Sequence, residues 1–152
     1  MAVSLKKGQG ISLRKDEFDL SSVTIGLGWD VATESRGLLK SLFTKKEEDY
    51  DLDAIAFLLG KDGKVQDLGR DRAGNVTLTN SDVIFFNNLR HPSGAIWLTG
   101  DNRTGDGDGD DEQIIVRLND LHARYESIIF VGSIYQGKEM GQSFGKVSNA
   151  FI

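Results

Sequence analysis

The segment "GDNRTGDGDGDDEQ", from Gly100 to Gln113, holds the residues with the clearest capacity for chemistry. Its carboxylates alternate with glycines, and Arg103 is the one base among them. Carboxylates about 4 Å apart repel each other by about 1 kcal/mol in bulk water, and by more near a protein. A multivalent cation is the simplest partner that lets such a segment become compact, so we interpret it as a cation site. The carboxylates are Asp101, Asp106, Asp108, Asp110, Asp111 and Glu112.

The ligand types in this segment favour calcium. Calcium accepts about six to eight oxygen ligands in a tolerant geometry. Glycines at positions 105, 107 and 109 let the backbone turn inward, and Asn102 and Thr104 add neutral oxygens. Magnesium requires a stiffer octahedron, and zinc prefers His or Cys, neither of which occurs in the segment. The oxygens suffice for two calcium ions.

Two alternatives to a loop-type calcium site are an EF-hand and a purely solubilising loop. The segment is not an EF-hand, because Asp111 and Arg117 stand where that motif requires Gly and Glu. An acidic loop can also serve only to keep a protein soluble. Alternating glycines cost backbone entropy that a solubilising loop need not incur, which favours metal binding.

Other oxygen-bearing side chains are candidates for the same site. Asp51 and Asp53 precede an apolar run at period two, so they share a strand face with Ile55, Phe57 and Leu59. Carboxylates on such a face need a partner or an exposed strand end, which favours a ligand role. Asn87, Asn88 and Asp30 end other apolar runs. The preference of Asn and Asp for turns also explains these positions. For Asp30, a metal-ligand role and this turn preference are evenly balanced.

Short apolar runs separated by Gly, Asn, Asp and Ser predict an all-β fold, an antiparallel β-sandwich of two sheets with short helical insertions. "GKDGKV" (Gly60–Val65) predicts a turn, and "HPSG" (His91–Gly94) predicts a hairpin between two strands. Thr33–Tyr50 and Gln66–Asn80 read as surface excursions. A helical turn or two is expected within Asn119–Ser127. We expect a single domain over residues 1–152.

Composition excludes several classes. The chain has no cysteine, which excludes disulfides and thiol chemistry. No apolar run approaches the roughly 20 residues of a spanning helix, and the N-terminus has no secretory apolar core, so we expect a cytoplasmic protein. The net charge is −5, and the segment from Asp101 to Glu112 carries all of it, because the other acids and bases cancel. This balance argues against nucleic-acid binding.

Five motifs occur in the order "GLGWD", "DLDA", "FFNNL", "GDNRTGDGDGDDE" and "GQSFGKVSNAFI". Together they resemble the TerD-type tellurite-resistance and stress-response proteins of bacteria, over essentially the whole chain. The resemblance implies a two-sheet β-sandwich that binds calcium and assembles with proteins of a membrane-associated stress-resistance complex. It implies ligands at Asp51, Asp53, Asn87, Asn88, Asp101, Asn102, Asp106, Asp108, Asp110, Asp111 and Glu112. Such proteins usually continue past "NAFI", so we expect this chain to lack their C-terminal strands.

The leading hypothesis is therefore a non-enzymatic calcium-binding module. One rival is a metal-dependent hydrolase that uses His91 and His122. Both histidines lie in polar turns and read as exposed bystanders, and no serine stands in a recognisable triad context. A second rival is a scaffold that assembles through exposed strand edges.

Overall fold

The computed structural model describes residues 19–31, 50–99 and 111–151. Strands dominate these residues, and the helical structure within them consists of two 3-10 turns, η1 (Leu118–Asp120) and η2 (Phe144–Lys146). The strands are β1 (Val23–Val31), β2 (Leu52–Gly60), β3 (Val83–Ile84), β4 (Ile96–Leu98), β5 (Glu112–Val116), β6 (Tyr125–Ile134) and β7 (Val147–Phe151).

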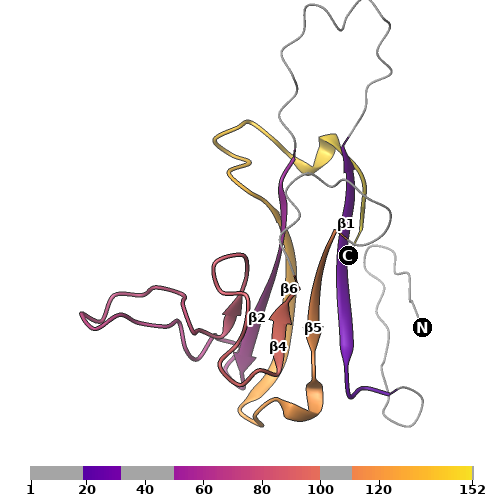
Figure 1. The fold of residues 1–152 in the computed structure, drawn as a ribbon. Helices are drawn as coiled ribbons and strands as arrows, with labels where there is room; N and C mark the ends of the chain where they lie inside the picture. Colours follow the sequence, from indigo (N-terminus) through magenta and orange to yellow (C-terminus); the bar gives the residue numbers. More distant parts are fainter. Residues whose placement is uncertain (1–18, 32–49, 100–110, 152) are drawn as a thin grey trace, which may run out of the picture.

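The strands form two antiparallel sheets (Figure 1). One sheet has the order β4-β5-β1-β7 and the other has the order β3-β2-β6. The pairings β2–β3 and β4–β5 join neighbours in sequence. The other pairings are long-range: β1 pairs with β5 and β7, and β2 pairs with β6 over its whole length. The all-β class and the two antiparallel sheets predicted from the short apolar runs are confirmed.

The core lies between the two sheets. Alternate residues of β2 point into it, and these side chains are at most 3% exposed. They pack with buried side chains of β1, β4 and β5 from the other sheet. The β2 residues are Leu52, Ala54, Ala56 and Leu58, and those of the other sheet are Leu27, Trp29, Ile96, Leu98, Ile114 and Val116.

The single carboxylate of β2, Asp53, therefore lies on the outer face of the strand. Asp53 does share a face with Ile55, Phe57 and Leu59, as the period-two pattern predicts, but that face points away from the other sheet. The small residues Ala54 and Ala56 occupy the core face instead. An alternating pattern identifies two faces of a strand, and which of them is buried depends on the opposing sheet.

Two predicted turns are confirmed. In "GKDGKV", the Gly63 backbone N–H donates to the Gly60 carbonyl at 2.9 Å. In "HPSG", the Gly94 N–H donates to the His91 carbonyl at 2.9 Å, and the His91 N–H donates to the Ile96 carbonyl at 3.0 Å. The hairpin expected here is only partly correct, because the turn pairs β4 with residues 89–91, whereas β3 pairs with β2 in the other sheet. The predicted helical segment between β5 and β6 is the single turn η1.

The polar excursion Gln66–Asn80 is a short hairpin that projects from the sheets (Figure 1). Thr77 N–H donates to the Gly69 carbonyl at 3.0 Å, and Asp71 N–H donates to Asn75 at 3.0 Å. Gly69 has a φ of +63°, and a Cβ there would lie 2.1 Å from the Thr79 carbonyl oxygen. Only glycine fits this position without displacing backbone. The other excursion, residues 33–49, lies outside the described residues.

No helix in the described part of the chain is long and apolar enough to cross a membrane.

Candidate metal site and a second polar network

Glu112, the first residue of β5, joins the two sheets. Its side chain is 1% exposed, and its Oε2 accepts a hydrogen bond from the backbone N–H of Ala54 at 2.6 Å. Ala54 belongs to β2 in the opposite sheet. A buried carboxylate is costly unless it is hydrogen-bonded, so this contact ties the acidic end of β5 to the start of β2.

Asp111 is attached to β1. Its Oδ2 accepts a hydrogen bond from the backbone N–H of Trp29 at 3.0 Å, and its own N–H donates to the Leu27 carbonyl at 2.9 Å. Trp29 in turn donates its indole Nε1–H to the Tyr50 carbonyl at 3.0 Å, directly before Asp51. These hydrogen bonds thus link Asp111, which directly precedes β5, through Trp29 to Tyr50, which lies just before β2.

The backbones of four predicted ligands therefore lie at one end of the sandwich, which we call the acidic rim. Asp53 is 5% exposed, and the Asp51 carbonyl accepts a hydrogen bond from Tyr135 N–H at 2.8 Å, where β6 ends. The acidic rim consists of Asp51, Asp53, Asp111 and Glu112. Within the described ranges, no three His, Cys, Asp or Glu side chains are grouped so that they could hold a metal ion by themselves.

The remaining predicted ligands of the loop lie outside the described residues. These are Asp101, Asn102, Asp106, Asp108 and Asp110. The two described ends of this segment are held together: Thr99 N–H donates to the Gln113 carbonyl at 2.9 Å. The segment therefore leaves and re-enters the fold beside Asp111 and Glu112.

Asn87 and Asn88 occupy a tight turn after β3. Asn87 is exposed, whereas Asn88 is 6% exposed and its amide braces the preceding segment. The Asn88 Oδ1 accepts from Asn80 N–H at 3.1 Å, and Nδ2 donates to the Val83 carbonyl at 2.7 Å. These bonds explain the burial of Asn88 without a metal. Asp30, for which a ligand role and a turn role were equally expected, lies within β1 and pairs with Ser148 of β7.

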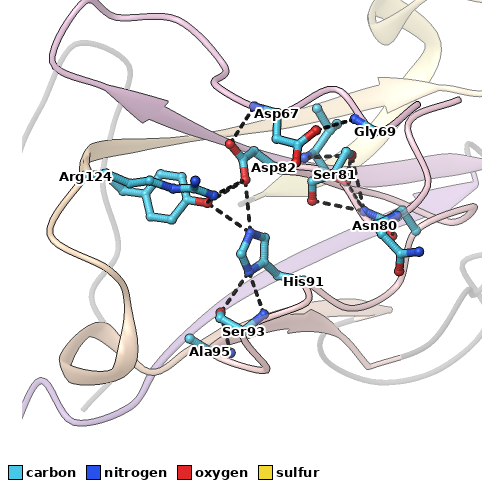
Figure 2. Close-up of polar contacts among 12 residues, drawn as sticks. Asp67, Gly69, Asn80, Ser81, Asp82, His91, Ser93, Ala95 and Arg124 are labelled. Carbon is cyan, nitrogen blue, oxygen red and sulfur yellow. Dashed lines mark hydrogen bonds and ion pairs between the residues drawn. The ribbon is translucent and has the colours of Figure 1, made fainter. Parts of the chain in front are cut away.

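A second polar network centres on Asp82, which is 1% exposed (Figure 2). Its Oδ1 accepts from the Tyr125 hydroxyl at 2.5 Å, and the His91 Nε2 lies 3.0 Å from the same oxygen. Its Oδ2 accepts from the Asp67 backbone N–H at 2.9 Å. The Arg124 guanidinium lies 3.4 Å from Oδ1 and also contacts the Tyr125 hydroxyl. The network connects the base of the projecting hairpin to β6.

The electrostatics of this network keep Asp82 anionic. Burial raises the pKa of Asp82, but hydrogen bonds from Tyr125, His91 and the Asp67 backbone, with the charge of Arg124, outweigh it and hold the pKa below its ordinary value. Burial and the hydrogen bond to Asp82 raise the pKa of Tyr125. The phenol therefore stays protonated and donates to the carboxylate.

The expectation that His91 is an exposed bystander is wrong. His91 is 6% exposed and contacts Asp82, Tyr125 and Ser93. The sequence around the serines shows no triad context, but in the structure Ser93 Oγ lies 2.8 Å from His91 Nδ1. His122 is exposed, as predicted. The partners of His91 include residues 9 and 34 positions away, a separation that leaves no local signal in the sequence.

Comparison with known proteins identifies the family. The TerD domain model matches residues 1–152. A tellurium resistance protein TerX of Serratia marcescens is 66% identical over 152 residues, which cover all of this chain and 71% of that protein. Tellurium resistance protein TerD of the same species is 43% identical and is covered to 67%.

A solved structure shares the fold. It is a homologue of the telluride resistance protein TerD from Streptomyces coelicolor, with a TM-score of 0.56 and 25% identity. The match covers 87% of this chain but 63% of the other, so this chain spans less than two thirds of the length of that structure. From the family model and these relatives, the chain belongs to the TerD domain family.

Proposed function

We propose that this chain is a calcium-binding, non-enzymatic module of a bacterial stress response that contributes to tellurite resistance. The names of its relatives support the resistance role. The observation that carries calcium binding is the placement of Asp111 and Glu112. Both are tethered to the backbone of the sandwich, directly beside the point where the glycine-alternating acidic segment enters the fold.

The donor chemistry of the acidic rim suits calcium. Its four carboxylates supply hard anionic oxygens, and the segment 101–110 contributes three further aspartates at alternate positions, with Asp101 and Asn102. The proposal assigns the ligands to both sets, and these oxygens suffice for two ions. Bound calcium supplies the positive charge that offsets the mutual repulsion of the carboxylates.

The backbone of the sandwich positions the proposed calcium ligands. Glu112 and Asp111 are held by backbone donors from both sheets, so the acidic rim is organised by the sandwich and not by the loop alone. With calcium bound, the loop takes one shape, and that shape is the surface that a protein partner reads. The partner belongs to a membrane-associated resistance complex, and the module itself works in the cytoplasm.

A calcium titration followed by backbone NMR tests this proposal. Calcium should shift the amide signals of the segment 100–113 and of Ala54 and Trp29, whose N–H groups donate to Glu112 and Asp111. Signals at the opposite end of the sandwich, such as those of Asp120 and His122, should stay unchanged. If no signal moves at millimolar calcium, or if all shifts are scattered over the surface, the proposal is wrong.

A scaffold that self-assembles is the second candidate, because one observation favours it. Ile129 and Val131 on β6 are 49% and 37% exposed, and they pair across the sheet with Phe57 and Ile55. Among the described strands, β6 forms an edge of its sheet. Light scattering with and without calcium distinguishes an assembly from a monomer.

A further inference from the structure

Ser93, His91 and Asp82 form a continuous chain of hydrogen bonds (Figure 2). Ser93 Oγ lies 2.8 Å from His91 Nδ1, and His91 Nε2 lies 3.0 Å from Asp82 Oδ1. We propose that His91 activates the Ser93 hydroxyl as a nucleophile. The activated Ser93 reacts with acyl or phosphonyl groups that carry a good leaving group. This proposal is independent of calcium binding and of the acidic rim.

The surrounding hydrogen bonds assign the tautomer that a general base requires. The backbone N–H of Ser93 donates to His91 Nδ1 at 3.1 Å, so Nδ1 carries a lone pair. The proton of the neutral ring is then on Nε2, where it donates to Asp82. In serine hydrolases the serine faces Nε2 and the aspartate faces Nδ1. Here the two nitrogens are exchanged: the Nδ1 lone pair is shared between the Ser93 hydroxyl and the Ser93 backbone N–H, and the carboxylate holds Nε2.

The hydroxyl of Ser93 is oriented by a second contact. Its Oγ accepts a hydrogen bond from the Ala95 backbone N–H at 3.1 Å, which leaves its own proton to point toward His91 Nδ1. Ser93 lies at the third position of the turn His91–Gly94 and is exposed, whereas His91 and Asp82 are buried. Ser93 therefore lies at the surface, where a reagent can approach it, and its base is buried.

Asp82 acts as a positioning residue. It is held as a carboxylate by the Tyr125 hydroxyl, the Arg124 guanidinium and the Asp67 backbone N–H. A fixed anion at Nε2 orients the imidazole and stabilises the imidazolium that forms when Nδ1 takes a proton. The arrangement thus supplies a nucleophile, a base and an orienting carboxylate, the three groups that activate a serine hydroxyl toward a stoichiometric reagent.

An alkyl fluorophosphonate is one reagent of this class. The Ser93 Oγ forms a bond to phosphorus as the phosphorus–fluorine bond breaks. The hydroxyl proton passes to His91 Nδ1 and then leaves with fluoride as hydrogen fluoride. No oxidant, reductant or metal is needed. An activated ester reacts in the same way, with its phenolate as the leaving group.

The test labels the full chain with a fluorophosphonate that carries a reporter group, and locates adducts by peptide mass spectrometry. General-base assistance contributes at least about 10²-fold in rate, so Ser93 should be labelled about 10²-fold faster than the exposed serines Ser127 and Ser143. His91→Gln should reduce labelling of Ser93 to the rate of those serines. His122→Gln is the matched control, because His122 is exposed, and it should leave labelling unchanged.

Each other outcome contradicts the proposal. The absence of an adduct on Ser93, or equal labelling of all three serines, would show that the contacts only stabilise the turn. Unchanged labelling in a folded His91→Gln variant would show that Ser93 reacts because it is exposed. If circular dichroism shows that His91→Gln is unfolded, the wild-type chain in urea replaces it. There the preference for Ser93 should vanish, and its persistence would contradict a role for His91.

Discussion

The Oε2 of Glu112 and the backbone N–H of Ala54 are joined by a buried hydrogen bond of 2.6 Å that links the two sheets of the sandwich. Both residues lie at the end of the fold where the acidic segment begins. The same carboxylate thus contributes to the stability of the sandwich and belongs to the proposed calcium site. Stability and metal binding should therefore be coupled at this position.

Replacing Glu112 should destabilise the protein even without metal. Glu112→Ala leaves the Ala54 N–H buried without its acceptor and opens a cavity, which costs about 2–4 kcal/mol of unfolding free energy. Urea denaturation in the presence of a chelator measures this loss. Glu126→Ala on β6 is the control, because Glu126 is exposed and its removal should change stability by about 0.5 kcal/mol or less. If the two substitutions lower the unfolding free energy equally, Glu112 has no special structural role.

Calcium should raise the melting temperature. At free calcium 100-fold above the dissociation constant, binding to the folded state alone adds about 2.7 kcal/mol. For a chain of this size that corresponds to about 5–10 °C. The double variant Asp110→Asn/Asp111→Asn should lose most of this gain, whereas Asp120→Asn in the exposed turn η1 should keep it. Scanning calorimetry checks both, and an undiminished gain in the double variant would mean that other residues bind the ion.

Calcium should bind more tightly than magnesium. The flexible, ligand-rich segment suits the larger ion, whereas magnesium needs an octahedron and releases its water reluctantly. Isothermal titration calorimetry of the chelator-treated protein with each ion measures the difference. Equal affinities would contradict the argument from size and flexibility.

The network around Asp82 should make stability depend on acid pH. Because the pKa of Asp82 is lowered on folding, its contribution is fully present above the ordinary carboxyl value of 3.8 and is lost as the pH falls through the lower folded-state pKa. Asp82→Asn should lower stability at pH 7 by about 2–3 kcal/mol, since hydrogen bonds to a charged group are lost. The difference between wild type and variant should shrink below about pH 4. Urea melts at pH 7 and pH 3 test this, and a difference that stays constant with pH would show that the carboxylate charge is unimportant.

The projecting hairpin offers a matched pair of glycine substitutions. Gly69 and Gly74 both have a positive φ, of +63° and +88°, so alanine is strained at either position by about 1–2 kcal/mol. At Gly69 a Cβ would also lie 2.1 Å from the Thr79 carbonyl oxygen, whereas at Gly74 nothing lies within 4 Å. Gly69→Ala should therefore destabilise the protein clearly more than Gly74→Ala. Thermal unfolding checks the order, and similar melting temperatures would contradict the close approach at Gly69.

The β-rich class and the two turns at Gly60–Val65 and His91–Gly94 could be predicted from the sequence. Both signals are local: apolar residues alternate over a few positions, and Gly or Pro sets the backbone at a turn. The outward direction of Asp53 could not be predicted. Its strand has apolar residues on both faces, and only the opposing sheet decides which set is buried.

The network of Asp82, His91, Ser93 and Tyr125 could not be predicted either. Tyr125 and Asp82 are 43 residues apart, and nothing in the neighbourhood of either residue indicates the other. His91 looked exposed because it lies in a turn next to proline. It is buried because β6 brings Tyr125, and the base of the hairpin brings Asp82, against its ring.

Composition and short-range spacing are enough to reveal the acidic segment with its hard oxygen donors, the strand-rich class and the family resemblance. Tertiary structure alone decided that Glu112 and Asp111 are held by backbone donors from opposite sheets, and that His91 stands between Ser93 and Asp82. These relationships depend on how strands distant in sequence are paired and stacked. Such long-range pairing is set by the packing of the whole core and not by any one segment.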